Sequence, residues 1–166
     1  MQVICRLLEL PDTIARELHA NHARLPEAIT SSKAYSDVYR YWHAIEYQLL
    51  QHAPSSPAAR WLSLGTAVSA PSGDVPGARL VSPTDVAELD RLIQAIAPED
   101  LAGHYGAAAM DAAGVYPQTW QEWEETFDPL GQVLEHYSFL QFRARACAEA
   151  GHALLLVFEE LAEGEV

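Results

Sequence analysis

The sequence of 166 residues has few basic side chains, and lysine is almost absent from it. Ten Lys and Arg residues stand against 23 Asp and Glu, which gives a formal net charge of −13 at pH 7. Because a polyphosphate is bound by basic side chains that displace its counterions, this composition argues against a nucleic-acid partner. An anionic membrane surface is disfavoured for the same reason. The single lysine, Lys33, does not lie in a phosphate-binding Gly-x-x-x-x-Gly-Lys loop, and no nucleophile elbow or dinucleotide fingerprint is present.

Cysteine and long apolar runs are also scarce. Cys5 and Cys147 lie near opposite ends of the sequence, a spacing that fits neither a disulfide framework nor a paired metal site, so both are predicted to be buried thiols. The longest uncharged apolar stretch, residues 153–158, is about a third of a bilayer span. The first ten residues show no signal-peptide pattern. The expectation is a soluble protein in a reducing, cytoplasmic setting.

What is present favours an α+β fold, mainly helical, with a small sheet. Residues 1–10 have the composition of a strand ended by Pro11, and the apolar run ALLLVF at residues 153–158 predicts a buried strand. Because helices are expected between them, the N-terminal and C-terminal strands are predicted to pair in one sheet. We expect one domain over residues 1–158, followed by an acidic tail over residues 159–166.

Helical patterns fill most of the sequence between the two strands. Asp12 is expected to cap a short first helix, and apolar spacing predicts a second helix over residues 35–52. Ser82 and Pro83 are a strong helix start, and residues 129–150 form the longest helical pattern, ended by Gly151. A Ser, Pro and Gly-rich stretch over residues 66–78 is expected to be a surface loop within the domain.

Two pairs of candidate metal or acid–base residues stand three apart in the sequence. His43 and Glu46 fall on one side of the predicted second helix, where a His–Glu contact at the edge of the core is the favoured interpretation and an acid–base pair is the alternative. His19 and His22 are favoured as solvent-exposed histidines, because two ligands do not complete a zinc site. No metal, cofactor or catalytic residue is therefore assigned.

The most distinctive local feature is an aromatic and acidic segment near residues 116–128. Between Leu92 and Phe142 there is no Lys or Arg, while eight Asp and Glu residues occur. Trp120 and Trp123 either anchor a short helix to the core or form part of an interaction surface. The candidate partner-binding residues are Tyr116, Trp120, Glu122, Trp123, Glu124, Glu125 and Asp128.

The order and spacing of four segments resemble the YfbM-like family, domain of unknown function 1877. These segments are WHAIEYQLL, the helix start ARLVSPTDV, AAAMDAAGVYPQTW, and the long helix that runs into GHALLLVF. The resemblance implies a compact bacterial α+β domain, and it implies no activity, cofactor or catalytic residue. Members of the family commonly have a second histidine where this sequence has Glu46, so a shared histidine pair is not expected.

These observations support two hypotheses about function, which belong to different classes. The leading hypothesis is a non-enzymatic acidic protein that binds a basic protein partner, as an immunity or inhibitor protein binds a toxin. The alternative is an enzyme or small-ligand binder with a pocket lined by Trp42, His43, Glu46, Arg79 and Tyr116, since an arginine, a histidine and aromatic rings can hold a small anion.

Overall fold

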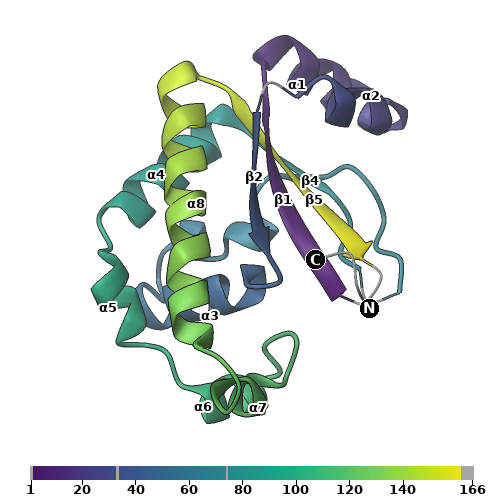
Figure 1. Cartoon of the computed structure of the whole chain (residues 1–166). Coiled ribbons are helices and arrows are strands. Elements are labelled where there is room, and N and C mark those ends of the chain that lie inside the picture. The colour runs from purple at the N-terminus through teal and green to yellow at the C-terminus, as the bar shows by residue number, and fades with distance from the viewer. Residues whose placement is uncertain (1, 33, 74, 162–166) are drawn as a thin grey trace.

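The computed structural model describes residues 2–32, 34–73 and 75–161. Within these ranges one antiparallel sheet has the strand order β2-β1-β5-β4-β3 (Figure 1). The strands are β1 (Gln2–Leu10), β2 (Ala34–Tyr39), β3 (Thr66–Ala67), β4 (Arg79–Val81) and β5 (Ala153–Leu161). The helices are α1 (Asp12–Ala20), α2 (Leu25–Thr30), α3 (Trp42–His52), α4 (Pro83–Gln94), α5 (Pro98–Ala102), α6 (Ala107–Ala112), α7 (Trp120–Glu124) and α8 (Pro129–Ala150). Short 3-10 turns are η1 (His22–Arg24), η2 (Pro57–Ala59) and η3 (Trp61–Ser63).

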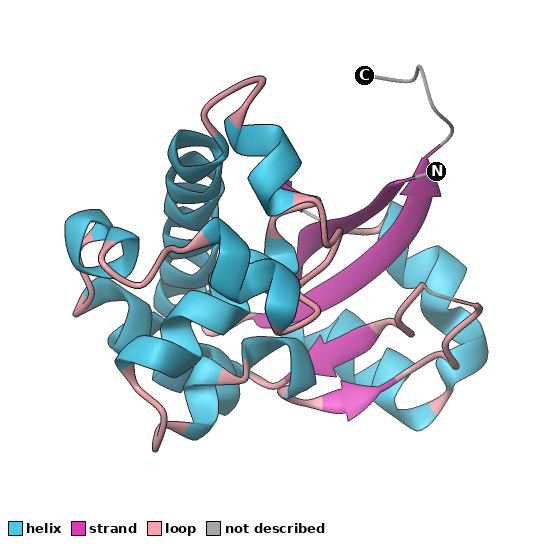
Figure 2. Ribbon diagram, turned by 90° about the horizontal axis from the view of Figure 1, so that it is seen from below, coloured by secondary structure: helices cyan, strands magenta, loops and turns pink. Residues whose placement is uncertain are grey.

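The two long strands lie side by side at the centre of the sheet, which confirms the predicted α+β fold and the pairing of the N-terminal and C-terminal strands. Their antiparallel register runs from Gln2 opposite Leu161 to Leu10 opposite Ala153. Both strands are apolar on both faces because both faces are covered by helices. Most helices gather on one side of the sheet, and the α1–α2 pair lies on the other (Figure 2).

The larger core lies between the sheet and α3, α4 and α8. Alternate residues of the central strands, such as Cys5 and Leu156, face this core. The Tyr137 hydroxyl of α8 donates to the backbone carbonyl oxygens of Ile93 (2.9 Å) and Ile96 (3.1 Å), which ties α8 to the end of α4. The smaller core lies on the other face, where α1 and α2 cover the intervening strand residues, such as Leu10 and Leu155.

Several predicted boundaries are confirmed. Ser82 caps α4 by accepting a hydrogen bond from the Asp85 amide at 3.1 Å, and α8 spans the predicted residues. Gly151 ends α8 as predicted, in a left-handed backbone conformation with a φ of 65°, and Gly65 has the same conformation with a φ of 68°. Cys5 and Cys147 are both free and buried. No helix in the described ranges is both long enough and apolar enough to span a bilayer.

Other boundaries were predicted wrongly. The predicted helix over residues 35–52 begins at Trp42, because residues 34–39 form the edge strand β2 instead. Asp12 does not cap α1: Pro11 is the capping residue, and Asp12 pairs with Arg16 at 2.9 Å. The predicted loop starts with the two residues of β3. Strand β5 continues through Leu161 into the predicted tail, and residues 162–166 lie outside the described ranges.

Candidate functional site

The acidic and aromatic segment forms α7 and its flanks, at one end of the molecule beside α6 (Figure 1). Asp111 of α6 accepts hydrogen bonds from the amides of Trp120 (2.9 Å) and Gln121 (3.1 Å), which are the first residues of α7. Burial acts to raise the pKa of Asp111, but these bonds outweigh it and the pKa is lowered. Trp120 itself is completely buried, and its indole N–H donates to the Val115 carbonyl oxygen at 3.0 Å. Trp120 therefore anchors α7 and is not available to touch a partner.

Trp123 is half-buried and belongs to the same aromatic cluster. Its ring packs edge-on against Trp120, with the centroids 5.2 Å apart, and against Tyr41 at 6.2 Å. The guanidinium carbon of Arg40 lies 4.1 Å from the centroid of the Trp123 ring, a cation–π contact. One side of α7 is therefore held rigidly between the core and Arg40.

The carboxylates of this segment face solvent. Glu122, Glu124, Glu125 and Asp128 are all exposed, and none forms an ion pair with a residue in the described ranges. Asp128 has a structural task as well, since it caps α8 by accepting a hydrogen bond from the Gly131 amide at 2.9 Å. Glu122 and Glu125 remain as carboxylates without a described partner. Glu124 lies near Tyr105, where burial first and then Glu124 raise the pKa of the hydroxyl.

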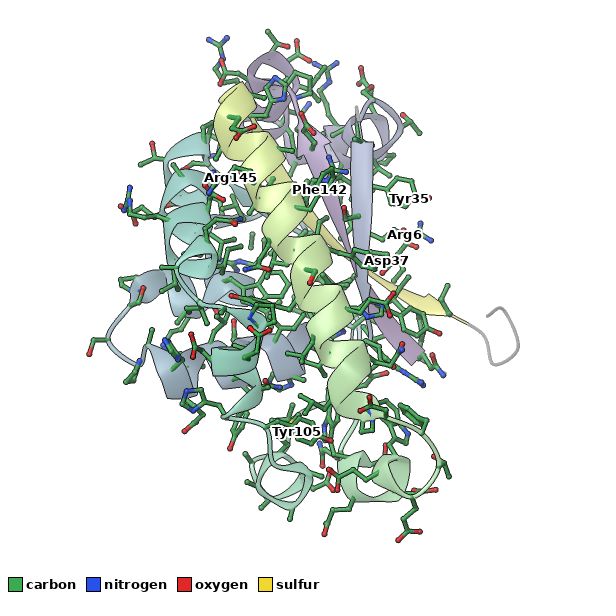
Figure 3. All side chains as sticks on the ribbon, turned by 60° about the vertical axis from the view of Figure 1, so that its left-hand side comes forward. Arg6, Tyr35, Asp37, Tyr105, Phe142 and Arg145 are labelled. Atoms are coloured by element: carbon green, nitrogen blue, oxygen red, sulfur yellow. The ribbon has the colours of Figure 1, made fainter. Side chains whose placement is uncertain are left out.

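Exposed aromatic rings continue from α7 along α8. Among the described residues, the large hydrophobic side chains with an exposed fraction of at least 37% are Phe127, Phe139, Phe142 and Tyr35. The three phenylalanines all fall inside the segment 92–142 that contains no basic residue. Tyr35 belongs to the neighbouring edge strand β2 (Figure 3), and its carbonyl oxygen accepts a hydrogen bond from Arg143, the residue after Phe142 on α8.

Three members of the alternative pocket form a stack that binds strand β1. The Trp42 ring lies nearly parallel to the rings of His43 and Tyr116, each at a centroid distance of 5.3 Å. Trp42 donates to the Val3 carbonyl oxygen at 3.1 Å, and the Tyr116 hydroxyl accepts from the Val3 amide at 2.7 Å. His43 Nδ1 accepts a hydrogen bond from the Tyr116 amide at 3.0 Å, and burial lowers the pKa of His43.

The other two members of that set meet on the turn after α3. A Glu46 carboxylate oxygen accepts from the Leu62 amide at 2.8 Å, and Arg79 donates to the carbonyl oxygens of Ser63, Leu64 and Gly65 at 2.8–3.0 Å. Burial raises the pKa of Glu46, opposed by the Leu62 amide and by Arg60. His43 and Glu46 thus bond to separate backbone segments, and the predicted contact between them is replaced by these two bonds.

The remaining candidate groups are two exposed histidines and two buried thiols. His19 and His22 are exposed, and in the described part of the chain no three His, Cys, Asp or Glu side chains are placed to share a metal ion. Burial raises the pKa of both thiols, that of Cys147 to about 12, with Glu9 adding to the rise and Arg143 opposing it. Neither thiol is a thiolate at neutral pH, the form that acts as a nucleophile.

Comparison with known proteins places the sequence in a family. The model of the family "Domain of unknown function (DUF1877)" matches residues 1–157. The chain belongs to the DUF1877 family. The match spans α7, α8 and the stacked rings of Trp42, His43 and Tyr116, which we call the Trp42 stack. No curated protein matches the sequence.

A solved structure supports the fold of this DUF1877 protein. The protein of unknown function YfbM from Escherichia coli superposes with a TM-score of 0.70 over 94% of this chain and 99% of its own, at 12% sequence identity. At that identity the likeness concerns the fold alone.

Sequence reasoning missed a buried polar cluster in this DUF1877 protein. Arg143 of α8 donates to Glu9 of β1 at 2.9 Å and to the Tyr35 carbonyl oxygen of β2 at 3.0 Å. His152 Nδ1 lies 2.7 Å from the other Glu9 oxygen. The side chains of Arg143 and Glu9 are only 6% and 12% exposed. The available signal was a glutamate, Glu9, between leucines in a mainly apolar strand.

Proposed function

We propose that this DUF1877 protein is a non-enzymatic interaction protein that binds a basic protein partner. Its binding surface runs from α7 along the outer side of α8. We call it the acidic–aromatic surface and define it by Glu122, Glu124, Glu125, Phe127, Glu135, Phe139 and Phe142. One observation carries the proposal: three of the four exposed large hydrophobic side chains among the described residues lie in the segment that has no Lys or Arg.

Rings and carboxylates have complementary tasks on such a surface. Exposed aromatic side chains supply apolar area that becomes buried in the complex, and aromatic residues are enriched among binding hot spots. Carboxylates at the rim attract a cationic partner and raise the association rate. Arg145, which follows the surface on α8, is occupied by Asp90 at 3.1 Å. Arg40 packs on Trp123 and near Phe127, but the four glutamates of the surface outnumber it, so the net charge of the surface is negative.

The proposed partner is a protein with a basic patch. In one version of this function the partner is a toxin whose cationic active site is covered by the surface, as with immunity and inhibitor proteins. The rigid mounting of α7 on Trp120 and Asp111 favours such a role, because a surface that is ordered before binding loses less entropy on association.

The test compares two variants of equal net charge. The triple variant Glu122→Lys, Glu124→Lys, Glu125→Lys reverses charge on the acidic–aromatic surface, whereas Glu88→Lys, Glu149→Lys, Glu160→Lys reverses three exposed charges elsewhere. Wild type and both variants are immobilised and exposed to a bacterial lysate, and captured proteins are identified. We expect a basic protein that binds the wild type and the control but not the surface variant. Capture of no protein, or equal capture by both variants, overturns the proposal.

The aromatic part of the surface is tested with the captured partner. We expect Phe139→Ala with Phe142→Ala to weaken binding about tenfold or more, mainly through faster dissociation, because loss of hot-spot rings costs more than about 1 kcal/mol. The charge-reversal variant is expected to act mainly on the association rate and to abolish its dependence on salt. Unchanged affinity in the double alanine variant would exclude these rings from the interface.

A further inference from the structure

A cleft separates α1 from the start of α4, on the sheet face opposite α8. Its volume is about 280 Å³, close to the lower end of the range of about 300–1,000 Å³ found for small-molecule sites. One wall is α1, and the other is formed by the β3 turn and the first residues of α4. The cleft shares no residue with the acidic–aromatic surface or with the Trp42 stack.

The floor of the cleft is apolar and formed by buried residues. Leu80 of β4 and Ala153 of β5 contribute the sheet side, and Ala15 contributes the helix side. Gly65 lines the cleft where the turn before β3 crosses β4. A side chain there would overlap the Leu80 carbonyl oxygen, so the turn and the strand pack backbone to backbone. The floor suits a small aliphatic group.

The first helical residues of α4 that line the cleft, Pro83 and Asp85, offer a carboxylate and not the free amides that usually attract anions to a helix N-terminus. Ser82 Oγ accepts the Asp85 amide hydrogen at 3.1 Å, and Pro83 has no amide hydrogen. Ser82 Oγ in turn donates to one Asp85 carboxylate oxygen at 2.9 Å. Asp85 is half-buried and forms no ion pair with a residue in the described ranges.

The opposite wall does not reverse this charge. Arg16 lines the cleft, but its guanidinium is paired with Asp12 at 2.9 Å, so the two charges offset each other. His19 and Thr66 add polar groups at the exposed rim. Asp12, Arg16 and Asp85 together give the lining a net negative formal charge, in a protein whose overall charge of −13 repels anions.

We infer that this cleft binds a small organic cation, an amine that carries a short aliphatic group. The ammonium group is held by Asp85, in a charge-assisted hydrogen bond from N–H to the carboxylate. The aliphatic group lies on Leu80, Ala15 and Ala153. This site is independent of the proposed protein partner, because the two occupy opposite faces of the sheet.

The experiment is an amide NMR titration of the uniformly labelled protein with three compounds of matched shape. Isobutylammonium carries a positive charge, isobutanol is neutral, and isovalerate is negative. We expect isobutylammonium to shift the amides of α1, residues 64–67 and the start of α4, and to bind more tightly than isobutanol. We expect isovalerate to leave these amides unchanged. No shifts with isobutylammonium, or equal binding of isovalerate, overturns the inference.

Variants of α4 assign the charge that recognises the amine. Asp85→Asn keeps the side-chain oxygen beside Ser82 but removes the charge, and we expect it to weaken isobutylammonium binding about tenfold. Glu88→Gln removes one exposed charge from the same helix outside the cleft and is expected to leave binding unchanged. Thermal unfolding followed by circular dichroism confirms that both variants fold. Equal affinity of the folded Asp85→Asn variant would disprove the role of Asp85.

Discussion

The hydrogen bond between the Tyr116 amide and His43 fixes a protonation state. The amide donates to Nδ1 at 3.0 Å, so this nitrogen carries no proton in the folded protein. Burial lowers the pKa of His43 because the charged ring would lose its hydration. The same ring stacks on Trp42, which holds β1 through Val3. Protonation of the His43 ring therefore opposes the packing of the segment around Tyr116 on β1.

Stability is expected to fall in mildly acidic solution because of His43. The pKa is about 6.5 in the unfolded chain and lower in the folded protein. The stabilisation is therefore fully present above about pH 6.5 and is lost as the pH falls from there toward the folded pKa. His43→Asn places an amide oxygen near the position of Nδ1 without a titrating group. Urea unfolding is measured from about pH 7.5 to about pH 5, the range in which histidine titrates. Over this range the free energy of unfolding is expected to fall less for this variant than for the wild type. An equal fall in the free energy of unfolding for both proteins would contradict the role given to His43.

The buried ion pair between Arg143 and Glu9 predicts a large effect of a single substitution. Arg143→Met keeps most of the aliphatic volume but removes the arginine from the buried Glu9, which keeps only the contact with His152, and this is expected to cost about 3 kcal/mol or more. Arg145→Ala on the same helix removes a more exposed arginine and is expected to cost about 1 kcal/mol or less. The free energies of unfolding in urea test both values.

A double variant distinguishes a stranded charge from lost packing. Adding Glu9→Gln to Arg143→Met removes the buried carboxylate, so part of the lost stability is expected to return. Additive effects of the two substitutions would show that the charge of Glu9 is not what destabilises the Arg143→Met protein.

At the scale of the elements, two glycines with the same backbone conformation have different surroundings. Gly65 and Gly151 both have left-handed φ values, of 68° and 65°. A side chain at Gly151 would meet open space, whereas one at Gly65 would overlap the backbone of Leu80. Gly151→Ala is therefore expected to cost about 1–2 kcal/mol from conformation alone. Gly65→Ala is expected to cost at least about twice as much, since β4 must also move. Equal melting temperatures would refute the steric argument.

The elements that could be predicted from the sequence are those whose signals are local. Ser82 and Pro83 start α4, Gly151 ends α8, and the apolar run after it forms β5. Strand β2 was missed because Val38 also fits the apolar spacing of the following helix. Its identity depends on pairing with β1, which is a contact distant in sequence.

The candidate site was harder to predict because its residues are defined by burial. Trp120 and Trp123 have the same side chain and stand three apart, yet Trp120 is fully buried and Trp123 is half-buried against Arg40. Both rings contact Tyr41, so the difference comes from the side of α7 that faces the core, where the Trp120 indole N–H bonds to Val115. No local pattern reveals that packing. Phe139 and Phe142 fall outside the apolar face that the helical spacing predicts for residues 129–150, and both are exposed. They were not assigned to the candidate surface because single exposed apolar residues are common on proteins.

At the scale of the whole molecule, the ion pairs and the excess of acidic residues lie in different parts of the fold. The ion pairs with described residues gather around α1, β1 and the end of α8, where most of the arginines lie. The segment 92–142 has eight acidic residues and no base. Arg40, which packs on Trp123, compensates only part of this charge. The carboxylates therefore repel one another, which destabilises the folded state of the free protein. A basic partner would remove this repulsion.

The repulsion predicts that added salt stabilises the protein. Raising NaCl from about 0.01 M to about 0.15 M shortens the Debye length from about 30 Å to about 8 Å. The excess of acidic charge is then screened more than the few close ion pairs, so the melting temperature is expected to rise. The Glu122→Lys, Glu124→Lys, Glu125→Lys variant is expected to show a smaller rise than the equally charged Glu88→Lys, Glu149→Lys, Glu160→Lys variant, because it removes repulsion where acidic residues are densest. Calorimetry of the three proteins at both salt concentrations measures the difference. Equal rises in the two variants would show that net charge, and not its concentration around α7, controls the response.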